Sequence, residues 1–215
     1  MDAAKKLDVV FDRDRDLDRS ITDLLATGQG VALAAMRAAV ERDRGAAGED
    51  RERRLVRIAA IVSDLEGRAA AELVLELLDD PSPVVRTSAG EALLDIAVDG
   101  ADEVMDAAQA AALRTDLVRA LQELPYVLGE IEDGRNVRVI QKLLDHPDAS
   151  VVASAIDTLV LLGDVASLPA IRRLEKDPRV AAHTDGEEEE SVPLAVLAAD
   201  AVETLGRGKG PGRPG

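Results

Sequence analysis

The sequence predicts an all-α protein made of stacked helical hairpins, and three observations lead to that prediction. Only 1% of the 215 residues are aromatic, with one Phe, one Tyr and no Trp, whereas β-barrels and sandwiches favour aromatic and β-branched side chains. Hydrophobic residues still make up 47% of the chain, enough for a sizeable core. One segment of the chain recurs at a fixed offset, and the apolar residues within it follow the spacing of a helix face.

The recurring segment covers residues 77–93, which align without a gap with residues 143–159. The offset of 66 residues corresponds to about two periods of ~33 residues, a length typical of helical repeat proteins. A third copy begins at residues 174–178 and resumes at residues 198–206. Eight positions of the first copy are identical in the second: Leu77, Leu78, Asp79, Pro81, Val85, Ser88, Ala89 and Leu93.

Each copy predicts a helix, a tight turn and a second helix. The first helix ends at Pro81 or Pro147, because proline lacks an N–H and disfavours helix in the residue before it. Ser82 or Asp148 can then cap the second helix by accepting hydrogen bonds from its free N–H groups. The second helix should bury an apolar stripe at helical spacing, formed in the first copy by Val85, Ala89, Ala92, Leu93 and Ile96. The alanines of this stripe are small and let neighbouring helices approach closely.

The other segments complete a chain of about five hairpins between residues 28 and 206. We expect an N-terminal helical cap over residues 1–27, with helices near 2–10 and 20–25, and a disordered basic tail over 207–215. The first expected hairpin consists of helices 31–42 and 51–65, joined by the loop 43–50. Helix 68–78 begins the second hairpin, and helix 137–144 begins the fourth. Between them we expect a divergent middle pair, 103–124 and 125–131, closed by a turn at 133–134.

The run Asp-Pro-Ser-Pro-Val-Val-Arg at residues 80–86, followed by Ser-Ala-Gly-Glu-Ala-Leu at 88–93, resembles the HEAT repeat, particularly its short bacterial form. The resemblance covers residues 69–97 and 137–163, and 165–206 more loosely. It implies a short right-handed α-solenoid whose second helices line a concave, often partner-binding surface. It also implies a ladder of Asp and Arg between repeats. Asp80 and Arg86 match those places, but His146 and Val152 replace them later, so the ladder should not be continuous.

The charge and the cysteine count exclude several classes of function. With 42 acidic and 26 basic residues the net charge is −16, which disfavours general binding to nucleic acid and to anionic membranes. The absence of Cys excludes disulfides, thiolate metal sites and cysteine nucleophiles. The N-terminus lacks an apolar signal core, and no apolar run reaches the ~18 residues of a membrane helix. We therefore expect a cytoplasmic protein.

Nothing in the sequence indicates catalysis, a cofactor or a bound metal. His146 and His183 lie in different repeats, where we expect solvated or capping roles; the repeated His-Glu pairs of HEAT-like hydroxylases are missing. No Ser-His-Asp set, phosphate-binding glycine loop or nucleotide fingerprint is present. Residues 12–18 superficially resemble a calcium loop, but Leu17 occupies the place of its glycine and Asp23 that of its closing Glu. We interpret this segment as solvated and self-neutralising.

Two charged clusters leave alternatives open. The acidic tract 185–190 interrupts the last repeat where the other copies make a short turn. It is either a docking loop for a basic partner or, as we expect, a solvated insertion. The basic cluster either binds an acidic partner or pairs with Glu49, Asp50 and Glu52, the outcome we favour; its members are Arg51, Arg53, Arg54 and Arg57.

The second helices carry apolar residues beside the buried stripe. Leu94 in one copy corresponds to Val160 in another, and Leu161 corresponds to Asp95. These residues either contact neighbouring repeats, as we expect, or expose an apolar strip that binds an amphipathic helix or peptide. The candidate protein-binding residues are this strip, its charged edges and the acidic tract: Arg86, Glu91, Leu94, Asp95, Asp157, Val160, Leu161, Glu187, Glu188, Glu189 and Glu190.

The sequence thus predicts a non-catalytic scaffold or adaptor that binds a partner protein through a basic or amphipathic segment. One alternative is a regulatory or chaperone-like subunit of an enzyme, as in HEAT-like bilin lyases, and a pigment-binding assay would distinguish it. A nucleic-acid binder like the HEAT-like alkyl-base DNA glycosylases is disfavoured by the charge of −16 and the lack of Trp. A salt-dependent DNA mobility shift would revive that alternative.

Overall fold

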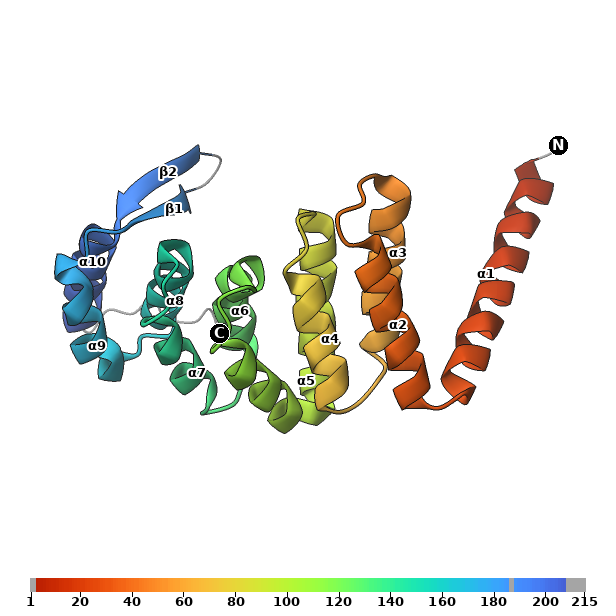
Figure 1. Cartoon of the computed structure of the whole chain (residues 1–215), viewed down its shortest axis with the longest axis horizontal. Helices are drawn as coiled ribbons and strands as arrows, with labels where there is room; N and C mark the ends of the chain where they lie inside the picture. Colours follow the sequence, from red (N-terminus) through yellow and green to blue (C-terminus); the bar gives the residue numbers. More distant parts are fainter. Residues whose placement is uncertain (1–2, 186–187, 208–215) are drawn as a thin grey trace.

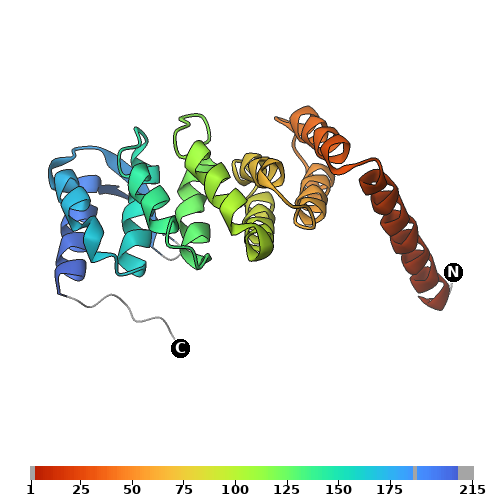
Figure 2. The same ribbon diagram turned by 90° about the horizontal axis from the view of Figure 1, so that it is seen from below.

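The computed structural model describes residues 3–185 and 188–207, whose helices stand side by side in an elongated array (Figures 1 and 2). Two 3₁₀ turns, Val165–Ser167 and Arg173–Lys176, flank the short helix α9 (Leu168–Arg172). The ten α-helices of the described residues are α1 (Ala3–Ala26), α2 (Gln29–Asp43), α3 (Glu49–Val62), α4 (Arg68–Leu78), α5 (Pro83–Ala111), α6 (Val118–Glu130), α7 (Asn136–Leu143), α8 (Ala149–Leu161), α9 (Leu168–Arg172) and α10 (Leu194–Gly206).

After α1 the helices form five hairpins. They are α2 with α3, α4 with the first half of α5, the second half of α5 with α6, α7 with α8, and α9 with α10. Each second helix packs on the next one: α3 on α5, α5 on α6, α6 on α8 and α8 on α10. The surface that these second helices share is named here the second-helix face. The predicted all-α solenoid of about five hairpins is confirmed.

Aliphatic side chains fill the interior of the solenoid. Leu55, Leu93 and Leu159 are fully buried on three of the five second-helix segments, in α3, α5 and α8. Alanines with no exposed surface lie beside them and allow close helix contact: Ala59, Ala89, Ala120, Ala155 and Ala198. Burial of each large aliphatic side chain stabilises the fold by roughly 1.5–3 kcal/mol. A core built this way has no need for aromatic residues.

Helix α1 is continuous, so the expectation of two short helices near 2–10 and 20–25 is wrong. The intervening residues contain neither proline nor glycine. Ion pairs one turn apart, Arg15 with Asp12 and Arg19 with Asp16, support helix within a stretch that has little apolar periodicity.

The boundaries of the middle hairpin also differ from the prediction of 103–124 and 125–131. Its first helix is the second half of α5, set off by a kink at Gly100, where the backbone leaves the helical region (φ −128°, ψ 43°). Its second helix, α6, runs through Pro125. Proline removes one helix hydrogen bond, but Pro125 is buried and packing holds the helix across it.

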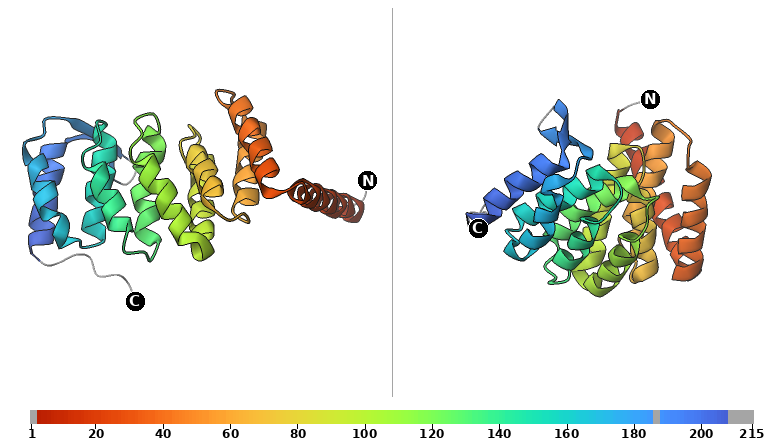
Figure 3. Two further views of the ribbon diagram at one scale, coloured as in Figure 1. Left: turned by 60° about the horizontal axis from the view of Figure 1, so that its bottom comes forward. Right: turned by 60° about the vertical axis from the view of Figure 1, so that its left-hand side comes forward.

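The last hairpin contains a pair of strands that the sequence did not predict. Strands β1 (Val180–Asp185) and β2 (Glu188–Pro193) are antiparallel; they connect the first and second helices of this hairpin and project from one end of it (Figure 3). The described part of the acidic tract thus belongs to an insertion in the last hairpin, where the sequence predicted one. Gly186 and Glu187 lie outside the described residues. The sequence contains one signal for such a strand pair, the dipeptide Asp185-Gly186, which is of a type common in hairpin turns.

None of the helices in the described ranges combines the length and the apolar character that crossing a membrane requires.

Candidate protein-binding surface

Hydrogen bonds between turns fix the second helices relative to one another, beginning with Arg51 and Asp80. Both side chains are nearly fully buried, and Arg51 Nη1 lies 2.9 Å from Asp80 Oδ1. Arg51 Nε also donates to the Asp43 carbonyl at 2.9 Å, and Asp80 accepts the Ser82 N–H at 2.9 Å. The bond to Asp80 raises the pKa of Arg51 above its ordinary value. The first hairpin is thereby bound to the turn of the second.

The next two connections use different chemistry. Asp79 Oδ1 accepts the N–H groups of Arg119 and Ala120 at 2.9 and 3.2 Å, so it satisfies free donors at the start of α6. His146 is buried; its Nδ1 accepts the Asp148 N–H at 3.1 Å. Its Nε2 must then carry the proton and donate to the Arg114 carbonyl at 3.2 Å. Of the two roles expected for His146, the solvated one is wrong, because the neighbouring hairpin covers the ring; its bonds to backbone groups of the turns are closer to the capping role.

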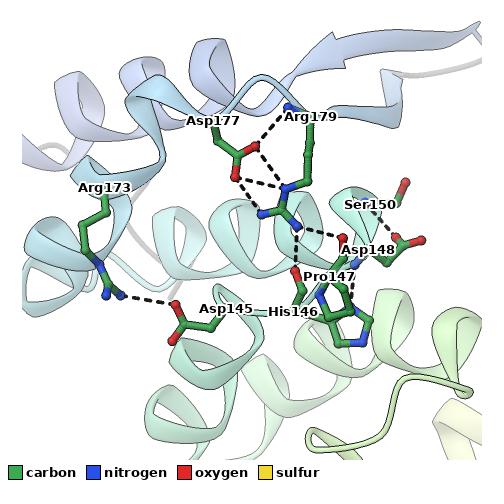
Figure 4. Close-up of polar contacts among 8 residues, drawn as sticks. All are labelled: Asp145, His146, Pro147, Asp148, Ser150, Arg173, Asp177 and Arg179. Atoms are coloured by element: carbon green, nitrogen blue, oxygen red, sulfur yellow. Dashed lines mark hydrogen bonds and ion pairs between the residues drawn. The ribbon is translucent and has the colours of Figure 1, made fainter.

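Arg179 makes the last connection (Figure 4). Its Nη1 donates to the carbonyls of His146 and Pro147, both at 2.8 Å, while Nη2 lies 2.7 Å from Asp177 Oδ2. The Arg179 bond holds the pKa of Asp177 below its usual value. Arg173 pairs with Asp145 at 3.5 Å beside it.

Contacts between turns therefore link all five hairpins, although the residues change. The ladder is not continuous, as the sequence predicted: an Asp–Arg pair makes the first connection, Asp79 bonds to backbone N–H groups at the second, and His146 stands in place of the Asp at the third. A histidine ring and Arg179 take over at that point. Arg86 belongs to the second helix of its own hairpin, where it donates to the carbonyls of Asp80 and Pro81 and pairs with Glu123 on α6 at 3.0 Å.

A groove of about 390 Å³ opens on the second-helix face between α6, α8 and α10. Its floor is mostly apolar, and two carboxylates stand among its lining residues. The lining consists of Tyr126, Ile156, Asp157, Val160, Leu161, Leu197, Asp200, Ala201 and Thr204. No cationic side chain is among them, so an apolar segment with positive charges fits this groove.

Tyr126 and Leu161 are the most exposed large side chains of the groove, at 40% and 57%. The Tyr126 hydroxyl donates to Asp157 Oδ2 at 3.4 Å. The pKa of Tyr126 is raised, chiefly because the phenol is partly buried and secondly because the negative charge of Asp157 lies near it. The phenol therefore stays neutral at physiological pH and offers an apolar ring with a polar tip, a combination common in protein interfaces.

The structure places three of the predicted binding residues in this groove: Asp157, Val160 and Leu161. Val160 and the corresponding Leu94 are half-buried and pack against the core, whereas Leu161 is exposed. Glu91 and Asp95 are exposed on α5, and Arg86 is occupied by its own hydrogen bonds. Glu188, Glu189 and Glu190 lie on β2, whereas Glu187 is outside the described residues.

Six of the nine lining residues are absent from the predicted binding set: Tyr126, Ile156, Leu197, Asp200, Ala201 and Thr204. The repeat alignment contained a signal for one of them, because Asp200 stands at the position of Asp157 and Glu91. An acidic residue thus recurs at one place in three second helices. Tyr126 lies in the divergent hairpin, where the alignment does not extend.

Three of the four arginines of the basic cluster form ion pairs within the described residues, and two of them do so with partners other than the predicted ones. Arg53 bonds to Glu49 and lies 3.7 Å from Asp50, as expected. Arg51 instead pairs with Asp80, and Arg54 pairs with Asp43 at 2.8 Å. The sequence could not show these two partners because folding brings them from other helices.

The segment 12–18 is helical and its ion pairs are internal, in agreement with the self-neutralising interpretation. Within the part of the chain that the structure describes, no three or more His, Asp or Glu side chains are grouped to hold a metal ion. The side chain of His183 on β1 is not among those described.

Comparison with known proteins identifies the repeat. Residues 71–98 match the family model of the HEAT repeat, a segment that runs from α4 through the turn at Asp80 into α5. The resemblance to the HEAT repeat is confirmed over these residues, which form part of the solenoid of helical hairpins. Repeat folds of this class commonly mediate protein–protein interaction through extended surfaces. No curated protein matches the chain.

Solved structures of engineered proteins are also similar to the chain. A crystal structure described as an engineered protein has 20% identity and a TM-score of 0.33, covering 88% of this chain and 90% of its own. Computationally designed armadillo repeat proteins for modular peptide recognition have 16% identity and a TM-score of 0.34, covering 86% and 98%. Another designed armadillo repeat protein has 16% identity and a TM-score of 0.30, covering 87% and 98%.

Proposed function

We propose that this protein is a non-catalytic scaffold or adaptor that holds a partner protein through a basic or amphipathic segment. The observation that carries this proposal is the groove between α6, α8 and α10, which combines exposed apolar side chains with two carboxylates and no cation in its lining. We also propose, from the charge and the absence of Cys, that it acts in the cytoplasm.

Both parts of the groove have a role in the proposed binding. Apolar residues of the partner segment would lie on Leu161, Leu197 and the ring of Tyr126, and burial of their surface would supply most of the affinity. Lys or Arg residues beside them would reach Asp157 and Asp200, which favour a positive segment over a negative one. Helix-in-groove recognition of this kind reads apolar residues at i, i+3, i+4 and i+7.

The groove is held in place before binding. Asp148 caps α8, Ser150 Oγ accepts the Ala182 N–H, and Arg179 holds the turn between α7 and α8 against the last hairpin. A surface that is already ordered loses less conformational entropy on association than one that orders when it binds.

A peptide titration tests the proposal. The probe is an 18-residue amphipathic peptide with Leu at i, i+3, i+4 and i+7 and Lys on both flanks, measured by fluorescence anisotropy. Leu161→Asp should weaken binding about tenfold or more, since it places a charge against apolar surface. Leu113→Asp is the matched control, because Leu113 is 76% exposed in the turn before α6. Equal affinities for both variants would contradict the assignment of the groove.

A further inference from the structure

Helix α1 leaves much of its apolar surface uncovered. Leu7, Val10 and Phe11 are each more than half exposed, and among the side chains of this helix that the structure describes only Leu24 and Leu25, in its last turn, pack against the core. Figures 1 and 2 show α1 diverging from α2 and standing apart from the rest of the array. A single helix without tertiary contacts is marginally stable in water, since its stability comes chiefly from packing its apolar face.

The helices next to α1 present a basic cup at the end of the solenoid. The cup has a volume of about 350 Å³ and lies between α2 and α3. The residues that line the cup are Ala39, Arg42, Asp43, Arg53, Arg54, Arg57 and Ile58. Four of them are arginines and one is an aspartate, so the cup is basic. Arg37 and Arg51 extend toward the next hairpin, where they pair with Glu76 and Asp80. The cup is therefore on the opposite side, facing the end where α1 stands.

The charges of the cup are only partly balanced. Asp43 bonds to Arg54 at 2.8 Å and lies 3.4 Å from Arg42, and the Arg54 bond lowers the pKa of Asp43. Arg53 is paired with Glu49. Arg57 is exposed and has no ion pair among the described residues. Asp43 and Glu49 together offset two of the four arginine charges, so the cup keeps a positive charge that a further carboxylate would reduce.

Helix α1 carries such a carboxylate in the middle of its apolar face. Val10, Asp14, Leu17 and Ile21 follow the 4-3-4 spacing of a single helix face. Asp14 has no ion pair among the described residues, unlike Asp12 and Asp16 on other faces. A carboxylate within an apolar face can be covered only by a surface that supplies a cation, because burial of an unpaired charge is costly.

The two arms match in length about Gly28. This glycine, which separates α1 from α2, has a positive φ of 101° that side chains other than glycine rarely adopt. Counted from Gly28, Asp14 and Arg42 are equally distant, as are Leu17 and Ala39, and Ile21 and Ala35. At about 1.5 Å per helical residue, Asp14 and Arg42 both lie roughly 21 Å from the hinge.

We propose that α1 is a hinged cap that closes on the basic cup of its own chain. Rotation at Thr27 and Gly28 places Asp14 beside Arg42 and Arg57, while Leu17 and Ile21 cover Ala39 and Ala35. The open arrangement of Figure 1 and this closed one are two states of the same hinge. Closure gives the solenoid the covered end that terminal repeats require, and a regulator that competes for either surface would release the helix.

Engineered disulfides test the closure, and the chain has no native Cys to interfere. Leu17→Cys with Ala39→Cys should form an intrachain disulfide, detected by mass spectrometry and by mobility on non-reducing gels, at a rate independent of protein concentration. Asp16→Cys with Ala39→Cys is the matched control. Because Asp16 lies about 100° around α1 from Leu17 and so on a different face, this pair should react at least about tenfold more slowly.

Charge exchange supplies the second measurement, in the background of the Leu17→Cys and Ala39→Cys pair. Asp14→Arg should slow disulfide formation about tenfold, and addition of Arg42→Asp should restore it, since the pair is then reversed rather than broken. Equal rates for the two cysteine pairs, or failure of the restoration, would overturn the proposal. Disulfides that form only between chains would also overturn it, in favour of α1 docking on a second copy. The groove between α6, α8 and α10 is unaffected by either result.

Discussion

The Arg51–Asp80 pair joins the first two hairpins through two charges that are almost completely removed from water. Such a pair contributes little net stability compared with a well-packed apolar pair, but it is expensive to break. Additional hydrogen bonds to the Asp43 carbonyl and from the Ser82 N–H satisfy the remaining donors and acceptors. The pair therefore fixes how these hairpins stack.

We predict that Asp80→Ala lowers the free energy of unfolding by about 3–5 kcal/mol, because it leaves the Arg51 guanidinium buried without a partner. Urea denaturation followed by circular dichroism measures the loss. The double variant Arg51→Met with Asp80→Ala should recover a large part of it, since no charge then remains buried. A loss below about 1 kcal/mol for the single variant would mean that the pair is solvated rather than buried.

The partners of Arg51 show what can be predicted at the scale of a residue. Its neighbours in sequence, Glu49, Asp50 and Glu52, are plausible by helix spacing, and Arg53 does pair with two of them. Asp80 lies 29 residues away and reaches Arg51 only after α3 and α4 have packed. Pairing within a helix can be predicted from spacing, whereas pairing between hairpins depends on the stacking geometry.

Among the elements, α5 and α8 begin at equivalent turns but are capped differently. Asp148 accepts hydrogen bonds from the N–H groups of Ser150 and Val151, as its position predicts. Ser82 occupies the matching position, but its hydroxyl makes no capping bond and has no hydrogen-bond partner among the described residues. Asp80 supplies a carboxylate to the Ser82 N–H instead.

We predict that Asp148→Ala destabilises the protein by about 1 kcal/mol, the usual effect of losing an N-cap. Ser82→Ala should change the free energy of unfolding by less than about 0.5 kcal/mol, because no capping bond is lost. The two variants are matched controls for each other in thermal or urea denaturation. A larger loss for Ser82→Ala than for Asp148→Ala would contradict these capping assignments.

The helices could largely be predicted from the sequence because the apolar stripes and proline turns recur. The signals failed where an element departs from the repeat. Proline at position 125 normally ends a helix, yet burial keeps it inside α6. Strands β1 and β2 have no apolar alternation to indicate them, and only Asp185-Gly186 marked the turn between them. Packing and cross-strand hydrogen bonds decide these cases.

At the scale of the whole molecule, the charge of −16 is distributed unevenly along the solenoid. Arginines gather at the α2–α3 end, whereas carboxylates border the groove at the α8–α10 end. The two surfaces thus favour ligands of opposite charge. In a repeat array each hairpin contacts mainly its neighbours, so the two ends can act independently.

The groove itself could be predicted only in part. The alignment of α8 with α5 predicts Asp157, Val160 and Leu161 as binding residues. A groove also needs the neighbouring helices α6 and α10, which form its other sides. Tyr126 on α6 and Leu197 on α10 complete the apolar floor, and neither occupies a position that the alignment singles out. The relative placement of three second helices, set by the contacts of His146 and Arg179, determines which residues meet.

The most direct test of binding in this groove is an exchange of charge between the protein and its ligand. Isothermal titration calorimetry would compare the Lys-flanked amphipathic peptide with a Glu-flanked version of the same apolar sequence. The unaltered protein should prefer the Lys peptide by about tenfold or more, and the variant Asp157→Lys with Asp200→Lys should prefer the Glu peptide. An unchanged preference in the variant, or no binding of either peptide to the unaltered protein, would contradict the assignment of this groove as the partner-binding site.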